Sequence, residues 1–287
     1  MVAIVGGLGA AMSWAVATLI SSRSSRMIGA ISVIAWVMTV GLVASVGPAI
    51  LSGPVQLGTN ELVGLLAVGI SYNAGLVLTY AALSIGRVSI VAPIVATEGA
   101  VAALASVALG EPLGPPTAVL LAVITIGVVL AAFERAGDVG AGPRTDPAVT
   151  RRTALLAIAA AVTFSVGLVV AGRLGEAGMP PAYIIVSSRV VGFLAIAVPL
   201  ALTRRLRLVR AAIWMVVVAG VLEALGSGLY VIAARDGVAA AAVLSSQFAA
   251  IAAVAAYVVF GERLQRVQVL GVVLVAVGVS VLAVVRA

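Results

Sequence analysis

The sequence predicts an all-α membrane protein with ten transmembrane helices arranged as two inverted five-helix repeats. Three observations predict this fold: the composition, the spacing of ten apolar runs, and a constant offset of 151 residues between the two halves. The chain is 63% hydrophobic and only 9% charged, whereas soluble domains carry about 25% charged residues. A soluble domain of 287 residues would need far more polar surface. We therefore expect the chain to lie in a lipid bilayer.

Ten apolar runs are long enough to cross the hydrocarbon of a bilayer, which takes about 20 residues. Turn residues and charges separate the runs, and a polar stretch rich in Gly, Pro, Asp and Arg follows the fifth. This stretch, residues 134–152, is the predicted linker between a first repeat over 1–133 and a second over 153–287. No basic residue precedes the first run, so we expect no cleaved signal peptide. The predicted spans are 2–20, 27–51, 61–83, 88–109, 115–133, 153–172, 182–202, 211–234, 238–260 and 267–285.

The two halves are related by a shift of 151 residues. The motifs "GEPL" at Gly110 and "GERL" at Gly261 give this offset, since 261 − 110 = 151. The same shift pairs further glycines and prolines without a gap: Gly41 with Gly192, Pro48 with Pro199, Gly69 with Gly220, Gly75 with Gly226, Gly86 with Gly237 and Gly127 with Gly278. Five spans is an odd number, so the second repeat should enter the membrane upside down. This arrangement is typical of secondary transporters.

The GE-x-L motif has a local explanation in both repeats. A glycine after a helix supplies the left-handed residue that closes the helix. A glutamate just before the next helix lies favourably at its positive N-terminal end. We therefore interpret the motif as a turn and a cap rather than as part of a binding site.

The residue types that are missing exclude several kinds of site. Histidine, cysteine and lysine are absent, and all seventeen basic residues are arginine. This excludes Ser–His and Cys–His nucleophiles, Schiff-base lysines, disulfides, and metal sites built on His or Cys. We also find no motif for an enzyme based on Asp, Glu, Ser or Tyr. We therefore expect no enzymatic activity, no cofactor and no bound metal.

Polar side chains inside the predicted spans are the candidates for a binding site. A charged residue near mid-membrane costs roughly 2.5–3.5 kcal/mol on insertion scales, so each needs a reason to be there. Both repeats place polar groups at mid-depth in their third and fourth helices, but with different chemistry, which suggests a binding cavity with two unlike walls. The polar candidates are Glu98, Arg189, Glu223, Asn73, Gln247 and Tyr72, the last being the repeat partner of Glu223 (223 − 151 = 72).

We expect Arg189 to pair with one of the two glutamates, since ionisable residues in membranes commonly pair with one another. In the structural interpretation, this ion pair only holds helices together and takes no part in binding. One arginine cannot neutralise two carboxylates, so the other should lie in a wet cavity or carry a proton. We expect Glu98 to line the cavity and to exchange a proton with the substrate or contact it, with Glu223 as the alternative. Trp14 could also line the cavity, although packing is the more common role for such a residue.

The last part of each repeat resembles the EamA family of the drug/metabolite transporter superfamily. The segments are "ALGEPLGPPTAVLLAVITIGVVLAA" and "VFGERLQRVQVLGVVLVAVGVSVLA", and the resemblance covers nearly the whole chain. The segment "SSRVVGF" around Arg189 is similar to the family's arginine in the second helix of a repeat. The first repeat has Met38 at the equivalent position (189 − 151 = 38). The resemblance implies transport of small metabolites, often export of amino acids or related compounds.

These observations predict a secondary transporter that exports an amino acid or a related amphipathic compound by alternating access, with protons as the coupling ion. The expected partners are a small-molecule substrate and the lipid bilayer, with no nucleic acid. We expect a multi-pass monomer or homodimer in the inner (plasma) membrane. Two alternatives stay open: a multidrug or amine exporter of the same superfamily, and a non-transporting protein with a vestigial transporter fold. The short members of the superfamily use a glutamate in their first helix, and this first span has no acid.

The arginines also predict an orientation in the membrane. Thirteen of them fall in the odd-numbered connectors between spans, and only Arg173, Arg235 and Arg286 lie on the other side. Positively charged connectors favour the cytoplasmic side. The charge distribution therefore places both termini outside, whereas the family resemblance more often implies cytoplasmic termini. We favour the orientation given by the charges.

Overall fold

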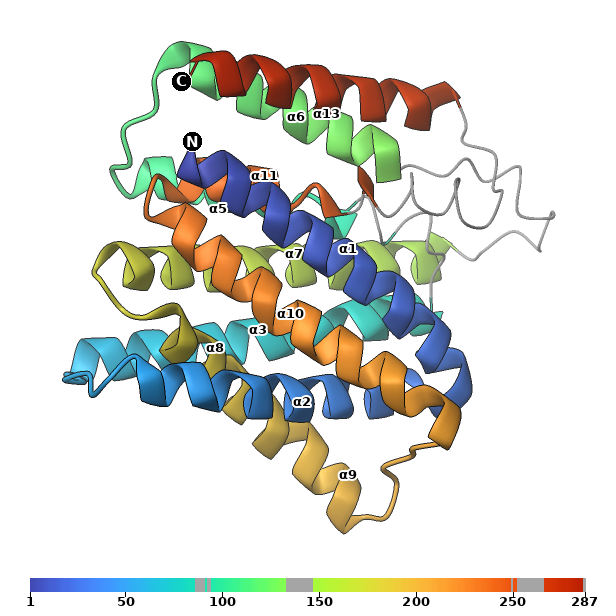
Figure 1. Ribbon diagram of the computed structural model, residues 1–287. Coiled ribbons are helices and arrows are strands. Elements are labelled where there is room, and N and C mark those ends of the chain that lie inside the picture. Colours follow the sequence, from blue (N-terminus) through green and yellow to red (C-terminus); the bar gives the residue numbers. More distant parts are fainter. Residues whose placement is uncertain (86–90, 92–93, 133–146, 249, 252–265, 286–287) are drawn as a thin grey trace.

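Helices make up all the regular secondary structure of the residues that the computed structural model describes (Figure 1). These residues are 1–85, 91, 94–132, 147–248, 250–251 and 266–285. Most of the predicted linker and the second GE-x-L motif, at Gly261, lie outside them. The α-helices are α1 (Val2–Ile28), α2 (Ala30–Leu51), α3 (Thr59–Ile85), α5 (Glu98–Ala108), α6 (Pro115–Ala132), α7 (Pro147–Glu176), α8 (Pro181–Gly192), α9 (Val198–Leu202), α10 (Ile213–Ala234), α11 (Val238–Ser245) and α13 (Arg266–Val285).

Within the described part of the chain, six helices are long and apolar enough to cross a membrane: α1, α2, α3, α7, α10 and the continuous segment Pro181–Leu202. Large apolar side chains such as Val43, Leu104 and Val119 are exposed on the outer faces of the helices, where a soluble protein would carry polar groups. The predicted all-helical membrane fold is therefore confirmed, and the protein is a multi-pass membrane protein. The count of ten spans stays a prediction.

Contacts between helices follow the offset of 151 residues. This shift relates α1 to α7, α2 to the segment Pro181–Leu202, α3 to α10, and α6 to α13. Correspondingly, α1 packs against α10 and α7 packs against α3, while α2 contacts α10 and α8 contacts α3. The pairs α2–α8 and α6–α13 join equivalent helices directly, and α6 and α13 lie side by side at one edge of the molecule (Figure 1). Reciprocal contacts of this kind are those of two units related by a two-fold axis.

Two equivalent glycines show the same reciprocity at atomic detail. A Cβ atom at Gly75 would lie 2.7 Å from the ring of Phe164, and one at Gly226 would lie 2.6 Å from Trp14 Nε1. Helices α3 and α10 can therefore approach α7 and α1 this closely only because these positions have no side chain. The repeat that the sequence predicts is thus reflected in the packing.

The fourth and ninth predicted spans are interrupted by turns, which corrects the prediction of continuous helices over 88–109 and 238–260. A turn at Ala96–Thr97 precedes α5, and a turn at Ser246–Gln247 follows α11. The two turns lie one residue apart after the shift, because 247 − 151 = 96. Helices α5 and α11 pack against each other, and a Cβ atom at Gly99 would collide with Ala242 O and with Ser246. Discontinuous helices at the interface between repeats are characteristic of transporter folds.

Hydrogen bonds tie the connectors together at each end of the molecule. At the first end, the Tyr183 hydroxyl donates to Gly53 O at 2.8 Å and Arg235 Nη2 donates to Met179 O at 3.3 Å. At the second end, the connector that precedes α10 lies against the start of α2 and is held there by Ser32 and Trp36. The even-numbered connectors 52–58 and 177–180 thus meet at one end, and the odd-numbered connectors at Gly29 and 203–209 meet at the other.

Candidate functional site

The Arg189 side chain is fully buried and lies beside Glu223, with 3.9 Å between Nη2 and Oε2. Arg189 comes from α8 and Glu223 from α10. Tyr72 on α3 completes the cluster, because its hydroxyl donates a 2.6 Å hydrogen bond to Glu223 Oε2 and its ring centroid lies 4.9 Å from the guanidinium carbon. The predicted contact of Arg189 with one of the two glutamates is confirmed for Glu223. We call Tyr72, Arg189 and Glu223 the axial cluster.

Two residues that the sequence analysis did not select also contact Arg189. Its Nη2 donates to Ser227 Oγ at 3.2 Å, and Ser227 Oγ donates to Glu223 O at 2.8 Å. Its Nη1 lies 3.4 Å from Met38 Sδ. Ser227 could have been found from its spacing, since it lies one turn after Glu223 on the same face of α10. Met38 could have been found as the repeat partner of Arg189.

The repeat symmetry explains why these residues meet. Tyr72 and Glu223 are repeat partners, and so are Met38 and Arg189, since both pairs differ by 151 residues. Residues that are related by a two-fold axis and also touch each other must lie close to that axis. The axial cluster therefore lies at the interface between the two repeats. Glu223 keeps 18% of its side chain exposed and Tyr72 is also partly exposed, whereas Arg189 is fully buried.

A π-helical segment, η1 (Phe193–Ala197), directly follows the turn that carries Arg189. Short π segments inside α-helices occur frequently at functional sites. The equivalent part of α2 is regular α-helix. The two repeats therefore differ in backbone geometry as well as in side chains next to the axial cluster.

Asn73 is buried next to the axial cluster, but its contacts are with the backbone. Its Nδ2 donates to Gly69 O and to Ser188 O, both at 2.9 Å, which joins α3 to α8. Its Oδ1 has no hydrogen-bond partner among the described residues. Asn73 thus holds in place the helix that carries Arg189.

Glu98 is the first residue of α5 and lies at the turn that interrupts the fourth span. It is 7% exposed, and its side chain has no ion pair or hydrogen bond within the described part of the chain. Ser165 Oγ on α7 donates to its backbone oxygen at 2.7 Å. A carboxylate at a helix N-terminus is stabilised by up to about 2 kcal/mol when partly buried, which offsets much of the insertion cost of roughly 2.5–3.5 kcal/mol. The broken helix therefore explains how an acid is tolerated in this apolar run.

Gln247 lies in the equivalent turn of the second repeat and is 1% exposed. Its Nε2 donates to Val243 O at 3.4 Å, and its Oε1 has no partner among the described residues. Glu98 and Gln247 thus occupy the two helix breaks rather than the axial cluster.

Trp14 packs on Tyr230 of α10, with 6.3 Å between the ring centroids. Its Nε1 is buried and has no hydrogen-bond partner in the described residues. The contact with Gly226 places it one turn along α10 from Glu223. Packing against Tyr230 explains the position of the Trp14 ring. The indole N–H has no partner among the described residues and lies beside the axial cluster, where it can donate a hydrogen bond to a ligand.

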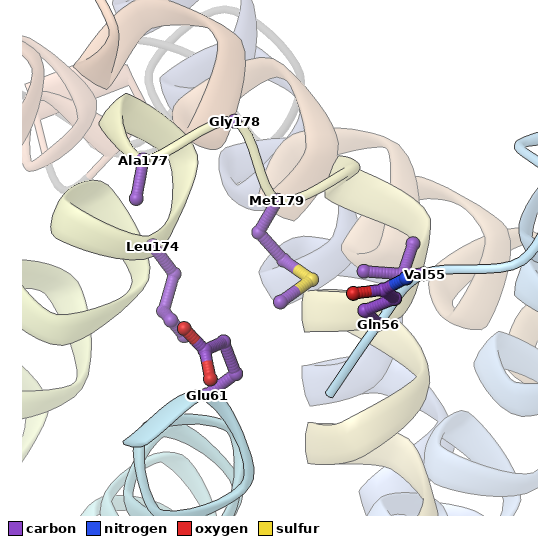
Figure 2. Close-up of a pocket in the computed structure, with 7 residues that line it drawn as sticks. All are labelled: Val55, Gln56, Glu61, Leu174, Ala177, Gly178 and Met179. Atoms are coloured by element: carbon purple, nitrogen blue, oxygen red, sulfur yellow. The ribbon is translucent and has the colours of Figure 1, made fainter. Parts of the chain in front are cut away.

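A cavity of about 180 Å³ lies at the first end of the molecule, between α3, α7 and the connector after α2 (Figure 2). Figure 2 shows the Glu61 carboxylate and the Met179 side chain on two sides of it. None of the polar residues predicted from the sequence lines this cavity, so it is separate from the axial cluster. Its lining residues are Val55, Gln56, Glu61, Leu174, Ala177, Gly178 and Met179.

The first GE-x-L motif closes its helix as predicted but caps a different helix from the one expected. Gly110 has a φ of 94°, the left-handed conformation expected of a glycine that ends a helix. The carboxylate of Glu111 accepts a hydrogen bond from the backbone N–H of Ala239, at 3.0 and 3.2 Å for its two oxygens. Ala239 lies in the first turn of α11 in the other repeat. The motif therefore joins the two repeats instead of acting only within its own turn.

The arrangement provides groups of both charges in a buried setting and suits a ligand with both polar and apolar parts. The Nε–H of the guanidinium has no hydrogen-bond partner among the described residues. The partly exposed Glu223 offers a carboxylate, and Trp14 and Tyr72 offer aromatic surface. No group of three or more acidic residues in the described part of the chain is placed to hold a metal ion.

The comparison with protein families decides the identity of this fold. The EamA-like transporter family matches residues 1–133 and 151–284. The chain belongs to this family. An EamA-like unit is thus present twice, once on each side of the polar stretch at 134–150.

A solved structure entitled "Crystal structure of protein" is similar over nearly the full length of both chains. It covers 99% of this chain and 96% of its own, with a TM-score of 0.78 and 19% sequence identity. At this identity the similarity shows a shared fold, and it does not extend to function. The comparison with curated proteins gives no match.

Proposed function

We propose that the protein is a secondary transporter that moves a small metabolite across the membrane by alternating access. Ten spans form two inverted EamA-like repeats over 1–133 and 153–287, joined by a linker at 134–152. The substrate binds at the interface between the repeats, at the axial cluster. The observation that carries this proposal is that the buried Arg189 and the oppositely charged, partly exposed Glu223 lie together where equivalent residues of the two repeats touch.

The contacts between connectors support the inverted arrangement. Each repeat has five predicted spans, so equivalent connectors of the two repeats should lie at opposite ends of the molecule. The connector at 52–58 meets the one at 177–180, and its repeat equivalent at 203–209 meets the start of α2. The discontinuous fourth and ninth spans are a further feature of inverted-repeat transporters.

The chemistry of the cluster favours an amino acid or a related amphipathic compound. Arg189 can bind a carboxylate through its guanidinium, and Glu223 can bind an ammonium group. Glu98, which has no cation beside it among the described residues, is the proposed proton carrier, and Tyr72, Asn73, Gln247 and Trp14 shape the site around these charges. Proton coupling would then drive export across the inner membrane.

A multidrug or amine exporter is the second candidate. Its support is the presence of two carboxylates, the buried Glu98 and the partly exposed Glu223, against one buried arginine among the described residues. Under this alternative the protein accepts cations that lack a carboxylate. The third candidate is a non-transporting protein with a vestigial transporter fold. Under this candidate we expect no flux of any compound.

Flux through purified full-length protein in proteoliposomes tests these candidates. We expect exchange of labelled amino acids against unlabelled ones, and no exchange in empty liposomes. The Arg189→Met variant should lose exchange of carboxylate-containing compounds, whereas Arg151→Met, which removes an exposed arginine at the start of α7, should keep it. Exchange of cationic amines alone would favour the second candidate. Absence of exchange for a broad panel of metabolites would contradict the proposed function.

A further inference from the structure

The second end of the molecule carries a set of exposed arginines from two segments. The connector between α9 and α10 contributes four of them and the last turns of α1 contribute two, and neither segment contains Asp or Glu. Their guanidinium groups make no ion pair with the described residues. We call these residues the arginine surface: Arg23, Arg26, Arg204, Arg205, Arg207 and Arg210.

The backbone beneath the arginine surface follows a fixed course. Arg207 is held on both sides of its peptide unit, because its N–H donates to Ser32 Oγ at 3.3 Å and its carbonyl accepts from Trp36 Nε1 at 3.0 Å. The N–H of Arg205 donates to Leu200 O at 2.8 Å. The arginines therefore project from an ordered segment, so less conformational freedom is lost when they bind a ligand.

Packing against the protein core also fixes the connector between α9 and α10. Leu206 packs against a buried cluster that includes Ile28 and Val33, and η2 (Arg210–Ala212) places Ala212 in that cluster. Leu206 thus enters the core, whereas its neighbours Arg205 and Arg207 face outward.

Exposed apolar residues place the arginine surface at the level of the lipid headgroups. Leu202 is 79% exposed on one side of the connector, and Trp214 is 55% exposed at the start of α10. Tryptophan is enriched at membrane–water interfaces, and the apolar surface of an exposed leucine favours the hydrocarbon next to it. The arginines between these two residues therefore lie where phospholipid phosphates are found.

We propose that the arginine surface is a binding site for the phosphate groups of anionic phospholipids. A guanidinium matches a phosphate with two parallel hydrogen bonds, and basic residues near an anionic leaflet add binding energy one by one. The exposed Leu202 and Trp214 beside the arginines contact the acyl chains of the same lipid. The ligand is thus a lipid rather than a free anion, and the site is independent of the transported substrate.

The test uses the full-length protein in detergent, with its unfolding temperature measured at increasing concentrations of short-chain phosphatidylglycerol, phosphatidylcholine or inorganic phosphate. We expect phosphatidylglycerol to stabilise the protein at far lower concentrations than the other two, and the effect to shrink as salt screens the charges. Arg205→Gln/Arg207→Gln should weaken the apparent affinity about thirtyfold, the effect expected from two basic residues at an anionic surface. Both side chains are exposed, and the hydrogen bonds of Arg207 use its backbone, so the variant should fold.

Arg151→Gln/Arg152→Gln is the matched control, because it removes the same charge from exposed positions at the start of α7. It should keep most of the response to phosphatidylglycerol. An equal loss in both variants would show that only the total charge matters, and would overturn the proposed site. Equal stabilisation by phosphatidylcholine, or by inorganic phosphate, would overturn it as well.

Discussion

Tyr72 and Glu223 occupy the same position in the two repeats, and the tyrosine hydroxyl donates a 2.6 Å hydrogen bond to the glutamate carboxylate. A contact between equivalent positions marks the axis of the repeat. Here the contact also brings the neutral hydroxyl donor of Tyr72 to the Glu223 carboxylate, which already lies beside Arg189. The axial cluster is therefore symmetric in position and asymmetric in chemistry.

Replacing Tyr72 by Phe should destabilise the protein by about 1.5–3 kcal/mol, because the hydrogen bond has a charged acceptor. Tyr183→Phe is the control, since it removes a neutral hydrogen bond to Gly53 O and should cost only about 1 kcal/mol. Unfolding of purified protein in detergent measures both. If the two variants lose the same stability, the Tyr72 hydroxyl does not have the charged partner described here.

Arg189→Met should destabilise the protein by about 3–5 kcal/mol, because it leaves the largely buried Glu223 carboxylate without its cation. Adding Glu223→Gln should recover part of the lost stability, since the unpaired carboxylate is then replaced by a neutral amide. A double-mutant cycle on unfolding free energies gives the coupling directly. Wild-type stability of Arg189→Met on its own would contradict the importance of the ion pair.

Glu98→Gln should fold and express like the wild type but lose pH-dependent transport, because glutamine keeps the shape and cannot carry a proton. Exchange of substrate at constant pH could persist, since it requires no net proton movement. Flux into proteoliposomes with and without a pH gradient separates these effects. Glu61→Gln, at the start of α3, is the control and should retain the gradient response. If Glu98→Gln responds to the gradient normally, Glu223 becomes the candidate proton carrier.

Glu111→Ala should cost about 1 kcal/mol through loss of the cap on α11. The local loss of stability should appear in the second repeat, because Ala239, whose N–H donates to Glu111, lies there. Hydrogen exchange should therefore speed up at the start of α11 and stay unchanged at the start of α6. Faster exchange at α6 alone would support the local cap that the sequence predicts.

The membrane orientation can be tested with reporters fused to the C-terminus. The thirteen arginines of the odd connectors predict that this terminus lies outside the cytoplasm. A reporter that is active only in the periplasm should then be active, and one that is active only in the cytoplasm should be silent. The opposite result would favour the orientation implied by the family resemblance.

The sequence was sufficient to predict the repeat because glycines and prolines at a fixed offset mark packing and turns, which both repeats share. It also predicted the pairing of Arg189 with a glutamate, because a buried cation needs an anion. It did not predict the break before Glu98, since a helix end inside the membrane depends on groups from other helices, such as Ser165 on α7. The same reason explains the cap of Glu111 on α11, which no local pattern indicates.

The axial position of Arg189 has a consequence for the ancestry of the chain. In a dimer of two identical five-helix subunits, a residue on the axis faces its own copy. Each arginine near that axis would face a second arginine, and each glutamate would face a second glutamate. Once two copies are joined in one polypeptide, each can diverge separately, and Met38 can stand opposite Arg189 while Tyr72 stands opposite Glu223. A single chain with two diverged repeats can thus place one arginine and one glutamate at its centre, which a dimer of identical subunits cannot do.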